Sequence, residues 1–203
     1  RMGVKVLKPL KSSNTKIIDY ANSKMRSAFM DIYLGANCRF CISTSCGFDS
    51  IPYIFRKPIA TVDQTLYSIH TERKYDVIIL YHHFNKENKK KLTMSEIFSI
   101  NDGLFLTTKD YEKGNILLEE NSPEEIKNLV IEMDERLENT WKENDKDLFL
   151  QKKFWTVFQN IIENIDETKY SDPKHSWKLF EIYKMKKVKK IANFSASFLR
   201  NNE

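Results

Sequence analysis

The stretch Phe40-Cys41-Ile42-Ser43-Thr44-Ser45-Cys46-Gly47-Phe48-Asp49-Ser50-Ile51-Pro52 decides the predicted fold, because an apolar segment runs there into small hydroxylated residues and a glycine. We expect a strand over residues 39–43, then a loop, then a short helix. Hydroxyls and free backbone amides at such a junction bind anions, and glycine permits close approach or a positive φ. Residues 43–47, the serine loop, therefore fit either a phosphate or diphosphate site or an ordinary strand-to-helix connection.

Strands and helices alternate on both sides of the serine loop. We expect earlier and later strands over residues 16–20 and 59–62, and a helix that ends near residue 36. This alternation predicts an α/β fold with a parallel sheet and flanking helices. The helix before the loop has an apolar face formed by Met25, Phe29, Ile32 and Tyr33.

The second half of the chain is predicted to be mostly helical. Ser122 as N-cap, Pro123 at the first helical position and Glu125 in the first turn together mark a helix start. A long amphipathic segment over residues 148–162 and a basic helical tail from Trp177 follow. The apolar residues expected to dock that tail are Phe194, Phe198 and Leu199.

Composition indicates a soluble globular protein. The 203 residues are 41% hydrophobic and 30% charged, without an apolar run long enough to span a bilayer and without a charged-then-apolar leader. Because the chain begins at Arg1 in strand-like sequence, we expect a missing N-terminal portion. Three cysteines, an odd number, favour reduced thiols and a cytoplasmic setting.

The net charge of +5 is concentrated in two lysine-rich runs, residues 86–91 and 184–190. Such runs are most often solvated surfaces, and the alternative is peripheral contact with anionic lipid at the inner face of a membrane. No aromatic-glycine RNA-binding signature accompanies them, so we expect no nucleic-acid partner.

Other chemistries fit the sequence less well. Ser45 could be the nucleophile of a hydrolase elbow, but Ser43 replaces the first glycine of that motif. Zinc is disfavoured because Cys41 lies within the predicted strand and adjacent histidines on a strand point apart. His70, His82, His83 and His175 are interpreted as surface or structural residues, because none shows a carboxylate partner in the sequence.

Several segments along the chain form a recognisable set. They are Arg1-Met2-Gly3, Ile17-Ile18-Asp19-Tyr20, Met30-Asp31-Ile32-Tyr33-Leu34, the serine loop with Phe55-Arg56-Lys57-Pro58, Glu120-Asn121-Ser122-Pro123-Glu124-Glu125-Ile126 and Ser197-Phe198-Leu199-Arg200-Asn201. Together they resemble a bacterial glycosyltransferase family of surface-polysaccharide biosynthesis. The resemblance implies the C-terminal half of a GT-B-like fold. Residues 1–140 would then be a Rossmann-like nucleotide-sugar-binding domain, and residues 141–203 a helical extension packing on it.

The resemblance also implies roles for particular residues. The serine loop, through Ser43, Thr44, Ser45 and Gly47, would bind the donor diphosphate, and Arg1 would neutralise phosphate charge. Glu119 and Glu120 would bind donor hydroxyls. The family's frequent lysine after the strand near Tyr81 is absent, because this sequence has Tyr81-His82-His83-Phe84.

The resemblance implies a nucleotide sugar as donor and a glycan or lipid-linked acceptor, with no metal and no separate cofactor. The catalytic base is expected in the missing N-terminal domain. Two alternatives remain: a nucleotide-sugar epimerase or hydrolase on the same fold, and a noncatalytic binding or assembly module.

Overall fold

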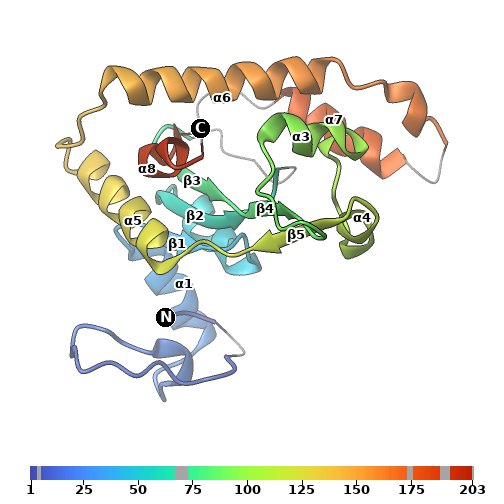
Figure 1. Cartoon of the computed structure of the whole chain (residues 1–203). Coiled ribbons are helices and arrows are strands. Elements are labelled where there is room, and N and C mark those ends of the chain that lie inside the picture. The colour runs from blue at the N-terminus through green and yellow to red at the C-terminus, as the bar shows by residue number, and fades with distance from the viewer. Residues whose placement is uncertain (4–5, 67–72, 173–175, 188–192, 203) are drawn as a thin grey trace. The chain divides into compact units, whose positions relative to one another are not determined.

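A computed structural model of the chain describes residues 1–3, 6–66, 73–172, 176–187 and 193–202 (Figure 1). The fold is α/β, as predicted, with a parallel sheet flanked by helices. The strand order in this sheet is β1 (Cys41–Ser43), β2 (Ile59–Gln64), β3 (Val77–Leu80) and β6 (Asn193–Phe194). The chain divides into two compact units, Arg1–Ile59 and Ala60–Glu203.

The smaller unit is built from short elements. A 3-10 turn, η1 (Tyr20–Asn22), precedes α1 (Ala28–Asn37), and η2 (Gly47–Asp49) leads directly into α2 (Ser50–Ile54). The hydroxyl of Ser27 caps α1 by accepting a hydrogen bond from the amide of Met30 at 3.1 Å. Gly35 lets α1 approach α2, because a Cβ there would lie 2.7 Å from Cγ2 of Ile51.

The strand predicted over residues 16–20 is wrong, and none of the described residues before Cys41 forms a strand. Ile17 and Ile18 are 48% and 57% exposed, so their β-branched pattern has no neighbouring strand to pair with. The apolar face expected for the helix before the serine loop is exposed, since Phe29 is 72% exposed. Met25, Ile32 and Tyr33 are exposed as well, and Met25 lies before the start of α1.

In the larger unit, β2 and β3 form the buried centre of the sheet. All four residues of β3 are buried, as the continuous β-branched run of a parallel strand requires. β2 pairs with β3 in parallel, but its register shifts between Thr61 and Gln64, so two residues of β2 face one of β3. A second, antiparallel pair is formed by β4 (His82–Asn85) and β5 (Ile116–Glu119).

Within the described ranges of the larger unit, four helices begin with a capping box, which explains where they start. In each box a side chain at the N-cap accepts from a backbone amide while an acidic side chain three residues later accepts from the N-cap amide. The four helices are α3 (Met94–Ser99), α4 (Thr108–Lys113), α5 (Pro123–Leu137) and α6 (Asp145–Glu163). The predicted start of α5 at Ser122 and Pro123 is thereby confirmed.

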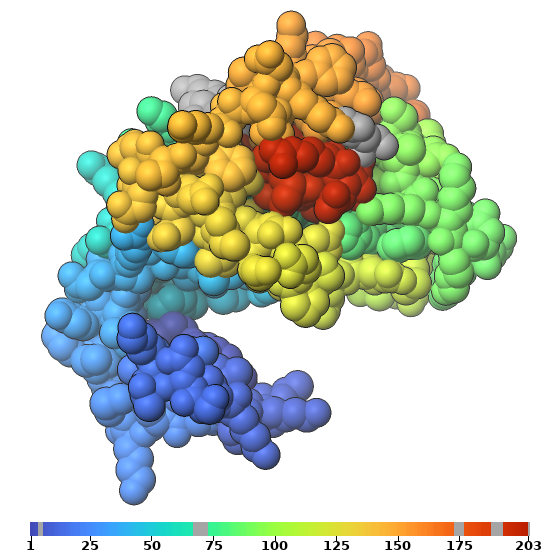
Figure 2. Space-filling model, turned by 60° about the vertical axis from the view of Figure 1, so that its left-hand side comes forward, coloured from blue at the N-terminus to red at the C-terminus, as the bar shows by residue number. Residues whose placement is uncertain are grey.

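The remaining elements complete the C-terminal part of the larger unit. They are the 3-10 turns η4 (Asn101–Gly103) and η5 (Glu167–Tyr170), and the helices α7 (Ser176–Lys187) and α8 (Ala196–Arg200). α8 contacts both α5 and α6, and Figure 2 shows it in red against these two helices. The predicted docking of Phe194, Phe198 and Leu199 is confirmed, since all three are buried.

The tail also adds a strand that the sequence did not indicate. Residues 193 and 194 form β6, and the amide of Ser195 donates to the carbonyl of Ile78 at 3.0 Å. Phe194 is fully buried, with its ring centroid 3.9 Å from that of Phe154 on α6. The tail therefore belongs to the hydrophobic core. Across the described ranges, no helix is both long and apolar enough to cross a membrane.

Candidate functional site

The serine loop follows β1 in the smaller unit, and an acidic side chain lies against it. The hydroxyl of Ser43, which is 7% exposed, donates to the carboxylate of Asp49. The thiol of Cys46 lies 3.5 Å from the same oxygen. Sequence reasoning did not include Asp49 in the site, and its carboxylate competes with any anion for the hydroxyl of Ser43.

The backbone of the serine loop differs from the expectation in one respect. The left-handed residue is Ser45, with φ of 59°, whereas Gly47 has no positive φ. Gly47 instead borders open space, because a Cβ built on it would meet no atom within 4 Å. A ligand can therefore approach the backbone at Gly47 closely, as expected. The expected alternative, a positive φ at Gly47, does not occur.

Arg1 is bound to a carboxylate. Its guanidinium donates to Asp19 at 3.1 and 3.0 Å and to the carbonyl of Lys8 at 2.8 Å. A hydrogen bond from Asn22, one from the amide of Leu10 and the charge of Arg1 lower the pKa of Asp19, so this carboxylate stays ionised. The charge of Arg1 thus has a partner within the smaller unit.

The three cysteines are free thiols. Burial, together with the charge of Asp49, raises the pKa of Cys41 to about 12, so Cys41 remains a neutral thiol near pH 7. The described residues contain no group of three histidine, cysteine or acidic side chains arranged to hold a metal ion.

In the larger unit, polar side chains gather where β2 and β3 end. Asp63 lies at the β2 bulge with φ of 51°, and its amide donates to the side-chain oxygen of Asn121 at 2.8 Å. In return, the amide of Asn121 donates to the carboxylate of Asp63 at 2.7 Å. The side-chain nitrogen of Asn121 also donates to the carbonyl of Leu80, at 2.8 Å. Ligands of α/β proteins bind at the carboxyl ends of parallel strands, so this edge is a second candidate region.

Glu119 and Glu120 lie at this second region. Glu119 is the last residue of β5, opposite His82, and both glutamates are exposed. Burial and then the charges of Asp63 and Glu120 raise the pKa of Tyr81, so its phenol stays protonated and available as a donor. The arrangement thus offers exposed carboxylates and a phenol, which suit a hydroxyl-rich ligand.

His82 has an acidic partner that the sequence did not reveal. Its Nε2 lies 2.9 Å from Oε1 of Glu125, the same residue that closes the capping box of α5. The expectation that histidines have no carboxylate partner is therefore wrong for His82, and His70 and His175 lie outside the described residues. Nδ1 of His82 is buried and has no hydrogen-bond partner, so no donor or acceptor meets the second nitrogen. The pair joins β4 to the start of α5 and is structural.

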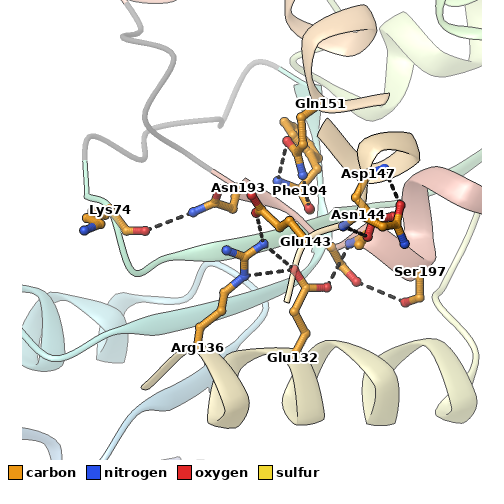
Figure 3. Close-up of polar contacts among 12 residues, drawn as sticks. Lys74, Glu132, Arg136, Glu143, Asn144, Asp147, Gln151, Asn193, Phe194 and Ser197 are labelled. Carbon is orange, nitrogen blue, oxygen red and sulfur yellow. Dashed lines mark hydrogen bonds and ion pairs between the residues drawn. The ribbon is translucent and has the colours of Figure 1, made fainter. Parts of the chain in front are cut away.

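Two buried carboxylates join the C-terminal helices (Figure 3). Glu132, only 1% exposed, accepts from Arg136 at 2.9 Å and from the amide of Ala196 at 2.8 Å. Asp147, also 1% exposed, accepts both guanidinium branches of Arg200 at 2.7 and 2.6 Å. Burial raises the pKa of Glu132 against the lowering effect of Arg136. These pairs fix α8 against α5 and α6.

The structure thus groups the sequence-predicted residues by unit. Ser43, Thr44, Ser45 and Gly47 form one loop of the smaller unit, which also contains Arg1, whereas Glu119 and Glu120 lie in the larger unit. Sequence reasoning missed Asp49, Asp63, Tyr81 and Asn121. An aspartate inside the β-branched run Ile59-Ala60-Thr61-Val62-Asp63 was the one available signal of a bulge.

Comparisons with protein-family models, with curated proteins and with solved structures find no match to this chain.

Proposed function

We propose that the chain binds the nucleotide-sugar donor of a glycosyltransferase for surface-polysaccharide synthesis, as a Rossmann-like half of a GT-B architecture. In this proposal the serine loop binds the diphosphate, and Arg1 contributes positive charge. Glu119 and Glu120 accept hydrogen bonds from donor hydroxyls. The acceptor is a glycan or a lipid-linked sugar, and the catalytic base is supplied by a second domain.

The open space beside Gly47 is the observation that carries this proposal. The hydroxylated residues Ser43, Thr44 and Ser45 precede this accessible backbone. The left-handed φ of 59° at Ser45 makes the chain turn just before Gly47. Hydroxyl and amide donors around an accessible backbone stabilise the charge of a departing diphosphate without a metal ion. The α/β fold with its parallel sheet supports the same function at the level of architecture.

Isothermal titration with uridine, guanosine and cytidine diphosphates tests the loop. Gly47→Val should weaken binding at least tenfold, about 1.4 kcal/mol, because the added side chain fills the space that the diphosphate needs. The variant should keep its thermal midpoint, since no atom lies within 4 Å of the new Cβ. Ser13→Val, on an exposed residue of the same unit, is the matched control and should leave affinity unchanged.

A second variant makes the test sharper because it should increase affinity. Asp49→Asn keeps an acceptor for the hydroxyl of Ser43 but removes a negative charge from the loop. Diphosphate affinity should rise about fivefold or more. No binding of any diphosphate to the folded chain, or equal affinities for all four proteins, would refute the loop assignment.

Analysis of the reaction products distinguishes a glycosyltransferase from a nucleotide-sugar epimerase or hydrolase of the same fold. An epimerase or hydrolase would release an epimerised or free sugar from the donor in the absence of an acceptor. Donor that is bound but unchanged under these conditions supports the transferase.

A noncatalytic module that docks on an anionic membrane is the second candidate, favoured by the outer face of α7. Trp177, Phe180 and Tyr183 are 43%, 62% and 51% exposed and recur every three residues, so they share one side of the helix. Lys184 and Lys187 lie on the same side. Aromatic rings flanked by lysines are typical of helices at the membrane surface. Residues 188–192, which complete the basic run, lie outside the described residues.

Co-sedimentation with vesicles of zwitterionic lipid, with and without anionic lipid, tests this candidate. Replacing the three aromatic residues of α7 by alanine should abolish binding to anionic vesicles. Phe149→Ala removes an equally exposed ring, 61%, from α6 and should have no effect. Equal sedimentation of both variants, or no sedimentation of the unaltered protein, would exclude the membrane module.

A further inference from the structure

A polar cavity of about 370 Å³ lies in the larger unit, apart from both candidate regions. It is formed where the end of α3 and the η4 turn meet η5 and the first turns of α7. Its volume is near the lower limit for ligand pockets, which fits a small molecule. We call it the lysine cavity, and its lining residues are Ser99, Asn101, Asp102, Lys169, Tyr170 and Lys178.

One wall of the lysine cavity is a turn of unusual backbone conformation. Asn101, Asp102 and Gly103 have φ of 52°, 54° and 69°, three consecutive left-handed residues. L-residues adopt this conformation mostly as isolated residues, and runs of it are costly. Gly103 is required here, because a Cβ would lie 2.5 Å from a ring carbon of Phe98. Asparagine, aspartate and glycine are the residues that adopt this conformation most readily, and turns of this kind cluster at ligand sites.

The negative charge in the lysine cavity is already compensated. The carboxylate of Asp102 accepts from the hydroxyl of Tyr170 at 2.8 Å and pairs with Nζ of Lys169 at 3.3 Å. Burial and then this hydrogen bond raise the pKa of Tyr170, which therefore remains a donor to Asp102. Asp102 and Lys169 thus form a neutral pair on one side of the cavity.

Of the two lysines that line the cavity, Lys178 has no oxygen of a described residue within hydrogen-bond distance. Its side chain is only 12% exposed, and the carboxylate it pairs with, Asp110, is 3.8 Å away, beyond hydrogen-bond distance. The other oxygen of Asp110 already accepts from Thr107 and Leu106. Nζ of Lys178 also faces the rings of Tyr170 and Trp177 at 5.8 and 5.6 Å. An ammonium has three N–H donors, and Lys178 lines the cavity, so its ammonium can donate to an anion that enters there.

We propose that the lysine cavity binds the anionic end of a small hydroxylated organic molecule, either a phosphate monoester or a carboxylate, with Lys178 as its charge partner. Asn101 adds specificity for hydroxyls. Its side-chain nitrogen donates to the carbonyl of Leu104 at 2.8 Å, which leaves its oxygen free to accept from the ligand. Ser99, at the end of α3, also lines the cavity, and its hydroxyl donates to the carbonyl of Glu96 at 2.7 Å. The lysine cavity is independent of the serine loop, so a failure of this proposal would not affect the proposed transferase function, and the reverse also holds.

Amide chemical shifts of the ¹⁵N-labelled full chain test the proposal, with glycerol 3-phosphate and glycerate as anionic probes and glycerol as the uncharged control. One or both anions should give saturable shifts in the residues around the lysine cavity, and glycerol should give none. The comparison of the two anions decides between phosphate and carboxylate as the preferred group.

Three variants locate the binding. Lys178→Met should weaken the anion at least tenfold, the usual value of a hydrogen bond to a charged group. Lys187→Met removes an exposed ammonium from the same helix and should leave affinity unchanged. If Lys178→Met unfolds, Asn101→Asp serves instead, because it keeps a residue suited to the left-handed turn and adds a repelling carboxylate. Shifts that do not saturate, that glycerol reproduces, or that survive Lys178→Met or Asn101→Asp would overturn the proposal.

Discussion

The two units of this chain differ in how many of their apolar side chains are buried. Among the described residues, the smaller unit buries the apolar side chains of Tyr20, Pro52 and Ile59, whereas the larger unit buries Phe105, Phe158 and many others. Most of the exposed large apolar side chains belong to the smaller unit. Apolar burial is the main source of folding free energy, so the larger unit holds most of the chain's stability.

Polar contacts of the smaller unit do not replace that missing core. Arg1 and Asp19 form an ion pair at 3.0 Å, with both side chains at least 15% exposed, and such pairs contribute little to stability. α1 spans 10 residues and α2 spans five, and helices of this length are marginal without tertiary packing. The serine loop therefore lies in the less stable unit.

Hydrogen exchange gives the largest expected difference between the units. Amides of β3 and α5 should exchange only through global unfolding, with opening free energies of about 5–15 kcal/mol. Amides of α1 and α2 should open at about 1 kcal/mol. Equal protection in the two units, measured by mass spectrometry under native conditions, would contradict the comparison.

Removing a buried carboxylate should give the next largest effect. Glu132→Ala leaves Arg136 with a single acidic partner and the amide of Ala196 without an acceptor. Denaturant unfolding should show a loss of about 3–5 kcal/mol in the free energy of unfolding. Glu124→Ala, on the exposed side of the same helix, should cost less than about 0.5 kcal/mol. Similar losses for both variants would argue against the role of Glu132.

The free energy of unfolding should depend on pH through His83, which is buried in the core. Burial lowers the pKa of His83 from 6.5 to about 4, while its Nδ1 lies 3.0 Å from the carbonyl of Tyr81. Because the folded pKa is below the unfolded value, this contribution is complete above pH 6.5 and is lost as pH falls towards 4. The loss should approach about 3 kcal/mol.

Urea unfolding at a series of pH values measures that loss. His83→Gln keeps a donor for the carbonyl of Tyr81 but cannot titrate, so its stability should fall less over the same range. Parallel pH profiles for the two proteins would show that His83 is not the group responsible.

The smallest effect is expected for an apolar residue of the smaller unit. Phe29→Ala should change the free energy of unfolding by less than about 0.5 kcal/mol, because the ring is 72% exposed. Phe158→Ala, at 1% exposure in the larger unit, should cost about 3–5 kcal/mol. Comparable costs would mean that Phe29 is covered in solution.

The sequence predicted the larger unit well because its signals are local. Ser122, Pro123 and Glu125 specify a helix start through contacts within one turn, and the β-branched residues of the run 59–62 indicate the strand β2. Glu132 could not be anticipated, since its partner at Ala196 is 64 residues away. β6 is only two residues long and depends on pairing with β3 rather than on its own pattern.

The smaller unit was predicted less well because periodicity does not show whether a face is covered. The spacing of Phe29, Ile32 and Tyr33 correctly predicts a helix, whereas Met25 lies before its start. Burial also requires packing against an apolar surface, and these exposed residues lack it. For the candidate site, the serine loop was located from its composition alone. The charge of Asp49 beside Ser43 depends on how the loop folds back, which no residue spacing specifies.

The contacts of Asn121 have a consequence for the chemical lifetime of the protein. Asparagine deamidates when the following backbone nitrogen attacks its side-chain carbonyl. Here the nitrogen of Ser122 donates to Glu125 at 2.8 Å, and the side chain of Asn121 is held by Asp63 and Leu80. The folded larger unit therefore slows deamidation of Asn121. Conversion to aspartate in the unfolded chain would place two carboxylates at the β2 bulge and hinder refolding of that edge.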